Sequence, residues 1–568
     1  MADFDAIVVG SGMSGGWSAK ELAERGLKVL VLERGKDVDR AKDYTDMLTP
    51  WQTPNFDRIN EDEVKQHYFR QALIADYAVH DSNKHFWVRD DEHPYETPDD
   101  KPYDWARGYH LGGRSLLWWR RAFRLGPQDF EANKQDGHGV DWPIRYEDIA
   151  PWYDHVERFA GISGSIENLP QLPDGIFQPA FELTCAESEL KRRVESEFPG
   201  RNVIPARIAH LTEPTQEQLD LGRSRCQSRR QCEKGCVFGA YFSANSATLP
   251  AAKRTGNCTI VTDAIVDTLD YDVATGRISG VNVVDRVSKE SRTYTARVVF
   301  LNASAIASAA ILLNSTSERF PNGLVNSSDQ VGRNLMDHVG GAGASGILDK
   351  FPDRGTFGRT PSGIYIPRYG NITENDKPYL RGFGFQGSGR PTSNFNGDKP
   401  GVGKAFKEGN RQPGPWRIGI GAFGEVLPYS DNRVTLHSSK KDQWGIPIPF
   451  IDCEMKENEK VLMREAGKDA HAMLEAAGCR DISSTRDRAL NLTRPGNLIH
   501  EMGTVRMGRD PGSSVLNGWC QAHDVPNLFV TDGGFMASSA CQNPSLGYMA
   551  FSARAANYAA DIIEQGVL

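Results

Sequence analysis

Two short apolar runs with a helical segment between them open the chain. Residues 5–10 read DAIVVG, which is typical of a buried parallel strand. Residues 16–26, GWSAKELAERG, carry apolar positions at helical spacing and end at a glycine, where helices commonly stop. LKVLVLERG follows at 27–35 as a second buried strand. The pattern predicts a β–α–β unit at the start of the chain.

The turn between the first strand and the helix carries a dinucleotide fingerprint. Gly10, Gly12 and Gly15 form GxGxxG, and Glu33 stands at the end of the second strand. The first glycine permits the tight turn, the second lets a pyrophosphate approach the backbone, and the third lets helix and strand pack closely. An acid at the place of Glu33 bonds ribose hydroxyls. The order of these features predicts a dinucleotide site, without choosing between FAD and NAD.

Composition narrows the class of protein. The chain has 568 residues, which is too long for a single hydrophobic core, so two or more domains are expected. The net charge of −8 argues against general nucleic-acid binding. We find no apolar run of about 18 residues, so no membrane span is expected. The N-terminus leads directly into a strand, without the basic region of a cleavable signal peptide.

Four further segments carry a family resemblance. They are GGRSLLW at 112–118, VGRNLMDH at 331–338, HEMGTVRMG at 500–508 and DGGFMASSACQNPS at 532–545. In this order and spacing the chain resembles the glucose–methanol–choline oxidoreductases, a family of FAD enzymes. Within that family it is most similar to the catalytic subunits of bacterial glucose, fructose, gluconate and glucoside 3-dehydrogenase complexes. The resemblance extends over nearly the whole chain.

The resemblance implies an α/β fold, α+β overall. A doubly wound, Rossmann-like FAD domain would be interleaved with a substrate domain built on an antiparallel sheet around 345–490. We assign 1–45, 100–135, 240–345 and 490–568 to the FAD domain, and 46–99, 136–239 and 346–489 to the substrate domain. Residues 386–415 are rich in Gly, Pro, Asn and Ser and are expected to form a long surface loop.

The resemblance also implies an active-site pair. His500 would be the catalytic base, because a neutral imidazole is suited to proton transfer near pH 7. Asn543 would bond and orient the same alcohol oxygen while a hydride moves to flavin N5. His338, in NLMDH, is expected to be structural or near the flavin, not catalytic.

Further residues are expected to contact FAD. GGRSLLW holds no histidine, so the resemblance implies a cofactor bound without a covalent link. Trp118 ends this motif and Trp119 follows it. We expect them to pack in the core, and stacking on a sugar ring is the alternative. The expected FAD contacts outside the fingerprint are Gly112, Gly113, Ser115, Asp532, Gly533, Asn543 and Ser545.

A cysteine cluster lies in the middle of the chain. Cys226, Cys232 and Cys236 form C-x5-C-x3-C, a spacing that can enclose a soft metal centre. Zinc fits poorly because it favours four ligands. One disulfide with one free thiol is an alternative. The same spacing in the resembling sugar dehydrogenases favours an iron–sulfur cluster: [3Fe–4S], or [4Fe–4S] with a fourth ligand such as Cys258.

Together these implications predict an FAD-dependent sugar dehydrogenase. It would oxidise a pyranose or glucoside hydroxyl, favoured at C3, and pass electrons through the cluster to a cytochrome or quinone-type acceptor. The alternatives are glucose C1 or gluconate oxidation, an oxygen-using alcohol oxidase, a flavin-bearing lyase and a non-catalytic metal-binding subunit. A small subunit is expected as partner. We expect a periplasmic location by co-export with a signal-bearing partner, with the cytoplasm as the alternative.

Overall fold

A five-stranded parallel sheet holds the first strand at its centre. The computed structural model describes residues 2–49, 51–74, 79–352, 354, 363–373, 376–393, 401–411, 413–486, 488 and 491–568. The strands lie in the order β18-β10-β1-β2-β6, and every neighbouring pair is parallel. They are β1 (Phe4–Val9), β2 (Val29–Leu32), β6 (Cys258–Val261), β10 (Ala296–Leu301) and β18 (Leu528–Val530).

Helices cover this sheet and bury its apolar residues. The helix predicted after the fingerprint is α1 (Met13–Glu24), and it packs against α12 (Ser545–Glu564) and α8 (Thr248–Arg254). Buried alanines along α12, such as Ala553 and Ala556, let the two helices approach closely. Strand β18 and α12, near the C-terminus, therefore pack into the same hydrophobic core as the first β–α–β unit.

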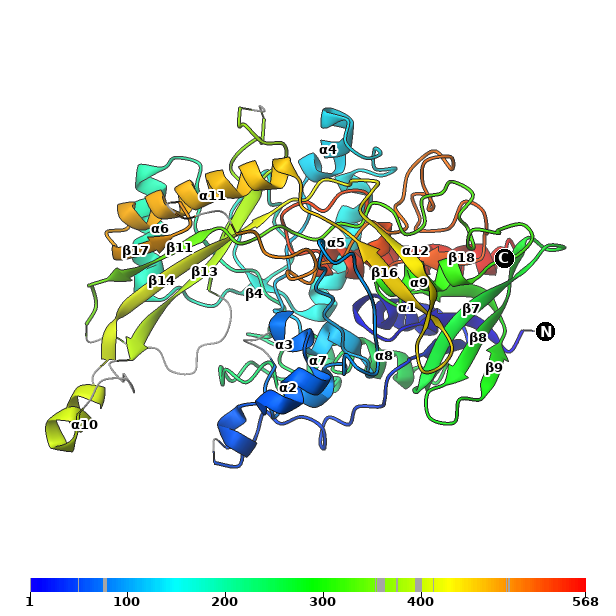
Figure 1. Ribbon diagram of the computed structural model, residues 1–568, viewed down its shortest axis with the longest axis horizontal. Helices are drawn as coiled ribbons and strands as arrows, with labels where there is room; N and C mark the ends of the chain where they lie inside the picture. Colours follow the sequence, from blue (N-terminus) through cyan, green and yellow to red (C-terminus); the bar gives the residue numbers. More distant parts are fainter. Residues whose placement is uncertain are drawn as a thin grey trace.

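A six-stranded antiparallel sheet forms the second main body. Figure 1 shows it, with α11, at the opposite end of the molecule from the N-terminus. Its strand order is β17-β11-β14-β13-β12-β5. Helices α11 (Glu457–Ala476) and α6 (Cys185–Glu197) pack on it. The strands are β5 (Ile204–Pro205), β11 (Gly343–Leu348), β12 (Ile364–Ile366), β13 (Phe383–Ser393), β14 (Pro413–Gly424) and β17 (Arg480–Ser484).

The prediction of a surface loop over 386–415 is wrong at both ends of that segment. Residues 386–393 continue β13, and β14 begins at Pro413, so the two strands pair antiparallel through this segment. The glycines permit the pairing: a Cβ on Gly387 would lie 2.3 Å from the carbonyl oxygen of Gly419. Between the strands lies α10 (Gly403–Arg411), while 394–400 and 412 lie outside the described residues.

Further sheets and helices complete the described part of the chain. Strands β7 (Ala264–Asp272), β8 (Arg277–Asp285) and β9 (Ser291–Tyr294) form an antiparallel sheet, and β15 (Arg433–Lys441) pairs with β16 (Pro447–Asp452). The remaining elements are α2 (Glu61–His67), α3 (Gln71–Ile74), α4 (Pro127–Asp136), α5 (Tyr146–Ala160), α7 (Gln216–Asp220), α9 (Ala305–Asn314), β3 (Ser163–Gly164) and β4 (Gln178–Pro179).

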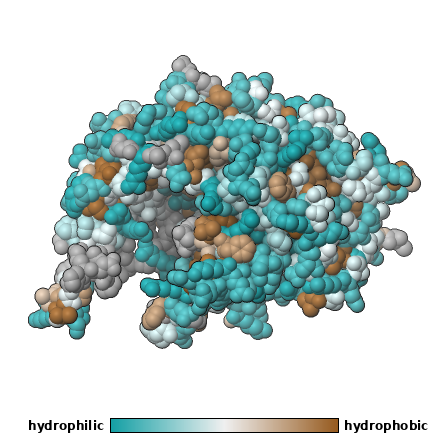
Figure 2. Space-filling view, viewed as in Figure 1, coloured by the Kyte–Doolittle hydropathy of each residue, from teal (hydrophilic) through white to brown (hydrophobic). Residues whose placement is uncertain are grey.

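The predicted fold class is confirmed: a parallel sheet covered by helices is joined to antiparallel sheets. The domain boundaries stay a prediction. Helix α5 lies in a segment assigned to the substrate domain, and it packs on α12, which lies in a segment assigned to the FAD domain. Within the described ranges, no helix has both the length and the apolar character needed to cross a membrane. Figure 2 shows a face that is hydrophilic over most of its area, with hydrophobic side chains in small groups.

Candidate active site

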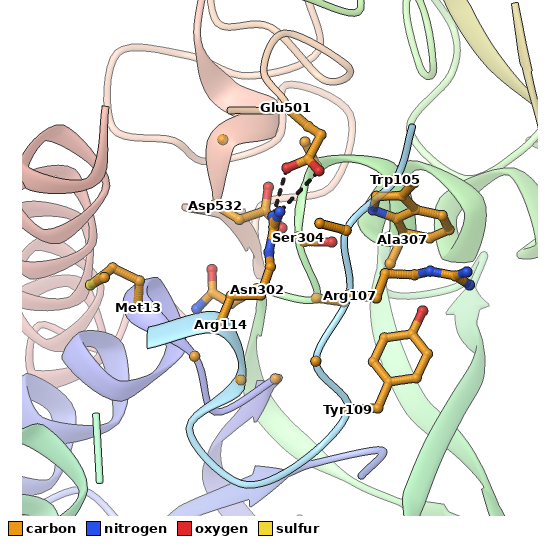
Figure 3. A pocket seen from close by; sticks show the side chains of 18 of the residues that line it. Met13, Trp105, Arg107, Tyr109, Arg114, Asn302, Ser304, Ala307, Glu501 and Asp532 are labelled. Carbon is orange, nitrogen blue, oxygen red and sulfur yellow. Dashed lines mark hydrogen bonds and ion pairs between the residues drawn. The ribbon is translucent and has the colours of Figure 1, made fainter. Parts of the chain in front are cut away.

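A cavity of about 360 Å³ lies where the two main sheets meet. Val9 and Leu32 line it from the parallel sheet, and Gln386 and Phe423 line it from the antiparallel sheet. Figure 3 shows side chains from several separate segments converging on this space. The cavity is large enough for a cofactor or a small-molecule substrate.

The fingerprint glycines lie at one wall of the cavity. Gly10 has a φ of +93°, which only glycine adopts without strain. A Cβ on Gly15 would lie 1.9 Å from the carbonyl oxygen of Gly10, so this glycine serves helix–strand packing and does not line the cavity. Gly12 does line it, with nothing nearer than 3.9 Å to an added Cβ. The open backbone at Gly12 is what a pyrophosphate requires.

Glu33 and Ser11 join the two ends of the β–α–β unit. The Ser11 hydroxyl donates to Glu33 Oε2 at 2.5 Å, and the Gly35 N–H donates to Oε1 at 2.9 Å. Burial raises the pKa of Glu33 above its ordinary value, and these hydrogen bonds oppose that rise. Glu33 lines the cavity, where its carboxylate can accept bonds from ribose hydroxyls.

The GGRSLLW loop lies against the fingerprint. The Gly112 N–H donates to Ser11 Oγ at 2.8 Å, and Ser115 Oγ donates to the Gly112 carbonyl at 2.5 Å. Gly112 has a φ of +84°, and a Cβ there would meet Asn245 Oδ1 at 1.6 Å. Gly113 and Ser115 line the cavity, whereas Gly112 shapes the turn behind them.

The C-terminal motif completes this wall. Asp532 Oδ2 accepts from Ser308 Oγ at 2.5 Å, and its Oδ1 accepts from the Gly534 N–H at 2.9 Å. Burial raises the pKa of Asp532 to about 6. Asp532, Gly533 and Ser545 all line the cavity. An open glycine backbone and buried carboxylates along one cavity fit a dinucleotide, so these residues could hold FAD.

His500 and Asn543 meet on the wall of the same cavity. Asn543 Nδ2 lies 3.2 Å from His500 Nε2, and Gln386 Nε2 donates to Asn543 Oδ1 at 2.6 Å. Burial, followed by the neighbouring His338 and Arg114, lowers the pKa of His500 well below its ordinary value. The imidazole is therefore neutral near pH 7 and can accept a proton.

His338 lies behind His500, outside the cavity lining. Its Nδ1 is 2.7 Å from His500 Nδ1, and its Nε2 is 2.9 Å from the Ala540 carbonyl oxygen. The side chain is fully buried, and burial lowers its pKa to about 4. The contact with His500 was not predicted, although His338 in NLMDH was expected to be structural or near the flavin.

An ion pair that the sequence analysis also missed joins two of the motifs. Arg114 Nη2 lies 2.6 Å from Glu501 Oε2, and Arg114 Nη1 lies 3.0 Å from Oε1 (Figure 3). Arg114 lies in GGRSLLW beside Gly113 and Ser115, and Glu501 lies in HEMGTVRMG beside His500. The bidentate pair fixes the GGRSLLW loop to the segment that carries His500.

The core packing expected for the two tryptophans is wrong for Trp119. Its side chain is 41% exposed, and both Trp118 and Trp119 line the cavity. Trp118 is half-buried, and its Nε1 donates to the Phe242 carbonyl at 2.9 Å. Arg120 and Arg121, which follow the two tryptophans in the chain, also line the cavity.

The three clustered cysteines do not form a metal-ligand set. Cys226, Cys232 and Cys236 line one small separate cavity and make no disulfide. Within the part of the chain that the structure describes, no three His, Cys, Asp or Glu side chains are close enough to hold a metal ion. Burial raises the pKa of Cys232 to about 12, against the opposing effect of Arg120. The iron–sulfur prediction is therefore not confirmed by the structure.

The loop that carries the cysteines nonetheless adjoins the large cavity. Glu233, next to Cys232 in sequence, lines that cavity together with Arg120. Arg120 is 1% exposed, and its guanidinium lies over the Tyr241 ring at 4.9 Å. Tyr241 lines the small cysteine cavity. The two cavities are thus separated by a few side chains.

Comparisons with known proteins agree on one family. Residues 4–340 and 428–552 match the N-terminal and C-terminal domains of GMC oxidoreductases. The chain is 26% identical to the fructose dehydrogenase large subunit of Gluconobacter japonicus, over 99% of this chain and 98% of that one. It is 27% identical to 2-methyl-1,2-propanediol dehydrogenase of Mycolicibacterium austroafricanum, over 99% and 96%. A formate oxidase variant from Aspergillus oryzae RIB40 shares the fold, with a TM-score of 0.63, 16% identity and complete coverage of both chains.

Proposed function

The chain belongs to the GMC oxidoreductases, which are FAD-dependent enzymes acting on hydroxyl groups, and from this premise we propose that it is a sugar dehydrogenase. The proposed substrate is a pyranose or glucoside, and the favoured position is the C3 hydroxyl. Oxidation of glucose at C1 or of gluconate remains the alternative within this class.

The observation that carries the proposal is the meeting of His500 and Asn543 on the cavity wall, 3.2 Å apart. In this proposal His500 Nε2 takes the hydroxyl proton of the substrate, and Asn543 Nδ2 donates to the same oxygen and orients the alcohol. Bound FAD supplies the acceptor for the two electrons that leave the carbinol carbon. Glu33, Gly12 and Asp532, which line the same cavity, would hold it.

The lining of the cavity supports a sugar substrate. Trp119 and Phe423 offer aromatic faces on which a pyranose ring can stack, and Gln386 and Arg121 offer polar groups to its hydroxyls. One relative is named a fructose dehydrogenase, which also supports a sugar substrate. The choice of C3 rests on the resemblance to glucoside 3-dehydrogenases.

The route by which electrons leave is a separate part of the proposal. We propose that Cys226, Cys232 and Cys236 bind an iron–sulfur cluster, [3Fe–4S] in preference to [4Fe–4S], that serves a cytochrome or quinone-type acceptor. Support comes from the spacing of the cysteines and from Glu233, a residue of their loop that lines the large cavity. A small subunit would assist, and a periplasmic location by co-export with it is proposed. The "large subunit" in the name of one relative agrees with such a complex.

Anaerobic titration of the holoprotein tests the function. The visible spectrum is recorded while methyl α-D-glucopyranoside, D-glucose, D-fructose, D-gluconate or 1-butanol is added, and iron and sulfide are measured on the same sample. Bleaching of the flavin by a sugar, with iron and sulfide present, is the expected result. Bleaching by 1-butanol alone would overturn the sugar assignment. Flavin without iron would overturn the cysteine assignment.

Two further readings separate the other enzyme classes. Peroxide formed in air at the rate of sugar oxidation would identify an oxidase, and the expected result is far less peroxide than reduced ferricyanide. A flavin that no substrate bleaches would favour lyase chemistry. The identity of the oxidised carbon follows from NMR of the product, where a 3-keto sugar is expected.

A further inference from the structure

We propose that His338 is a positioning residue that fixes which ring nitrogen of His500 carries the proton. In this arrangement His500 Nδ1 is protonated and His500 Nε2 is the bare nitrogen that faces the substrate. The inference rests on the proposed function, in which His500 is the base. It is carried by a continuous series of hydrogen bonds, from the Ala540 carbonyl to Gln386, in which each bond dictates the direction of the next.

The direction is set first at the Ala540 carbonyl. A carbonyl oxygen can only accept a hydrogen bond, so His338 Nε2, 2.9 Å away, must be the donor. His338 is fully buried, and burial lowers its pKa to about 4, which keeps the ring neutral near pH 7. A neutral imidazole has one N–H. Nδ1 of His338 is therefore an acceptor.

The direction then passes to His500. The two Nδ1 atoms are 2.7 Å apart, and this contact needs one donor. Because His338 Nδ1 is the acceptor, His500 Nδ1 must carry the proton. His500 is itself neutral near pH 7, since its surroundings lower its pKa. Its second nitrogen, Nε2, therefore carries no proton and can accept one on the cavity side.

The opposite end of the series gives the same answer independently. Gln386 Nε2 donates to Asn543 Oδ1 at 2.6 Å, which turns the Asn543 amide so that its Nδ2 faces His500. That amide nitrogen lies 3.2 Å from His500 Nε2 and can only donate. A donor opposite Nε2 favours a bare Nε2, but at 3.2 Å it is the longest contact of the series, so His338 at 2.7 Å is the stronger constraint. The tautomer inferred from His338 is thus the one that Asn543 accommodates.

Charged groups around His500 hold its place without changing this direction. The backbone N–H of His500 donates to Asp337 Oδ1 at 3.0 Å. Arg114 lowers the pKa of His500, and its bidentate pairing with Glu501 offsets that charge. When His500 takes up a proton, its Nδ1–H still points at His338 Nδ1, and this acceptor stabilises the resulting cation.

The first test needs no substrate. Histidine nitrogens of the FAD-bound protein are labelled with ¹⁵N, and His500→Asn identifies the His500 signals by difference. The chemical shifts are expected to show a protonated Nδ1 and a bare Nε2 in the wild-type protein. In His338→Phe, which has a ring of similar size without an acceptor, the Nε2-protonated tautomer is expected to appear. Protonated Nε2 in the wild-type protein, or no change in His338→Phe, would overturn the proposal.

The second test measures flavin reduction by stopped flow under anaerobic conditions. The probe is whichever of methyl α-D-glucopyranoside, D-glucose or D-fructose reduces the wild-type flavin fastest. His338→Phe is expected to lower the rate constant about 100-fold through the wrong tautomer and a weaker base. His338→Asn places an acceptor oxygen where Nδ1 was, and it is expected to retain the rate to within about tenfold.

Two controls separate this role from a structural one. FAD content and Tm are measured for both variants, and equal FAD content is expected. If His338→Phe and His338→Asn lose rate equally at equal FAD content, the positioning role is overturned. If none of the sugars reduces the wild-type flavin, the proposed function fails, while the ¹⁵N shifts still decide whether His338 sets the tautomer.

Discussion

The histidine–asparagine pair and the cysteine loop carry equally distinct sequence motifs, but the structure organises them differently. His500 and Asn543 are held on both sides by hydrogen bonds, from His338 and from Gln386. The three thiols of 226–236 share a small cavity but do not converge on one point within the described residues. The Ser228 N–H donates to the Cys226 sulfur at 3.5 Å.

The difference reflects what holds each group in place. The pair is oriented by protein donors and acceptors, which are present whether or not a substrate is bound. Thiol ligands of a metal repel one another once deprotonated, so their convergence depends on the ion. A site that the chain organises by itself can be tested one side chain at a time. A site that depends on an ion must be tested by measuring the ion.

The largest effect is expected at the base. His500→Ala should lower the rate of flavin reduction by about 10³-fold, because the nitrogen proposed to take the hydroxyl proton is lost. Stopped-flow bleaching with the sugar identified above measures it. His138→Ala is the matched control, because His138 is exposed and does not line the cavity. A loss below tenfold for His500→Ala would remove this residue from the role of base.

The next largest effect is expected at its partner. Asn543→Ala should slow flavin reduction by about 10²-fold, because the donor to the reacting oxygen is lost. Asn543→Asp keeps the size and the acceptor for Gln386 but removes the donor, so it should be as slow. Both variants are measured at saturating sugar to separate kcat from KM. An Asn543→Asp enzyme that matched the wild type would show that donation by Asn543 is not needed.

A smaller effect, confined to electron exit, is expected at the cysteine loop. Cys232→Ser should lower the iron content and slow ferricyanide reduction by about tenfold, while sugar still reduces the flavin at the wild-type rate. Cys185→Ser is the control, because Cys185 is a single half-buried cysteine at the start of α6. If neither iron nor acceptor rate changed in Cys232→Ser, the two regions would differ in function and not only in organisation.

Sequence alone predicted the parts of the molecule that depend on local order. The β–α–β unit, Gly10, Gly12 and Glu33 follow from a strand, a turn and a helix that are consecutive in the chain, and the structure places all three on the cavity. The family prediction is confirmed because its motifs occur in order over the whole length. The roles of His500 and Asn543 stay predictions, although the structure brings them together.

What the sequence did not reveal depends on contacts between distant segments. Gln386 reaches Asn543 from β13, 157 positions away in the chain, and its surroundings were expected to be a surface loop. Glycines suggested a loop there because no pattern distinguishes a flexible glycine from one that lets two strands approach. His338 was expected to be structural or near the flavin, but its hydrogen bond to His500 joins residues 162 positions apart and was not predicted. Such pairings arise from sheet register and packing, which no local pattern encodes.

The smallest effect expected is on pH dependence. The rate of flavin reduction requires a neutral His500, whose pKa is lowered well below 6.5 by burial, His338 and Arg114. An ordinary histidine would have lost half of the neutral form by pH 6.5. Here the neutral form persists as the pH falls through that value, so no loss centred near pH 6.5 is expected from His500. Measurement of kcat/KM for the sugar from pH 5 to 9 provides the profile.

A neighbouring acid supplies the control that makes this profile decisive. Asp337 accepts the backbone N–H of His500, and burial raises its pKa to about 7. A weak inflection between pH 6 and 8 is therefore expected from Asp337, and it should vanish in Asp337→Asn, which cannot ionise. Asp532, whose pKa burial raises to about 6, is a second source, so an inflection near 6.5 that persists in both Asp337→Asn and Asp532→Asn would instead belong to His500. It would mean that the base is open to water, and that the pair is no better sheltered by the protein than the cysteine loop.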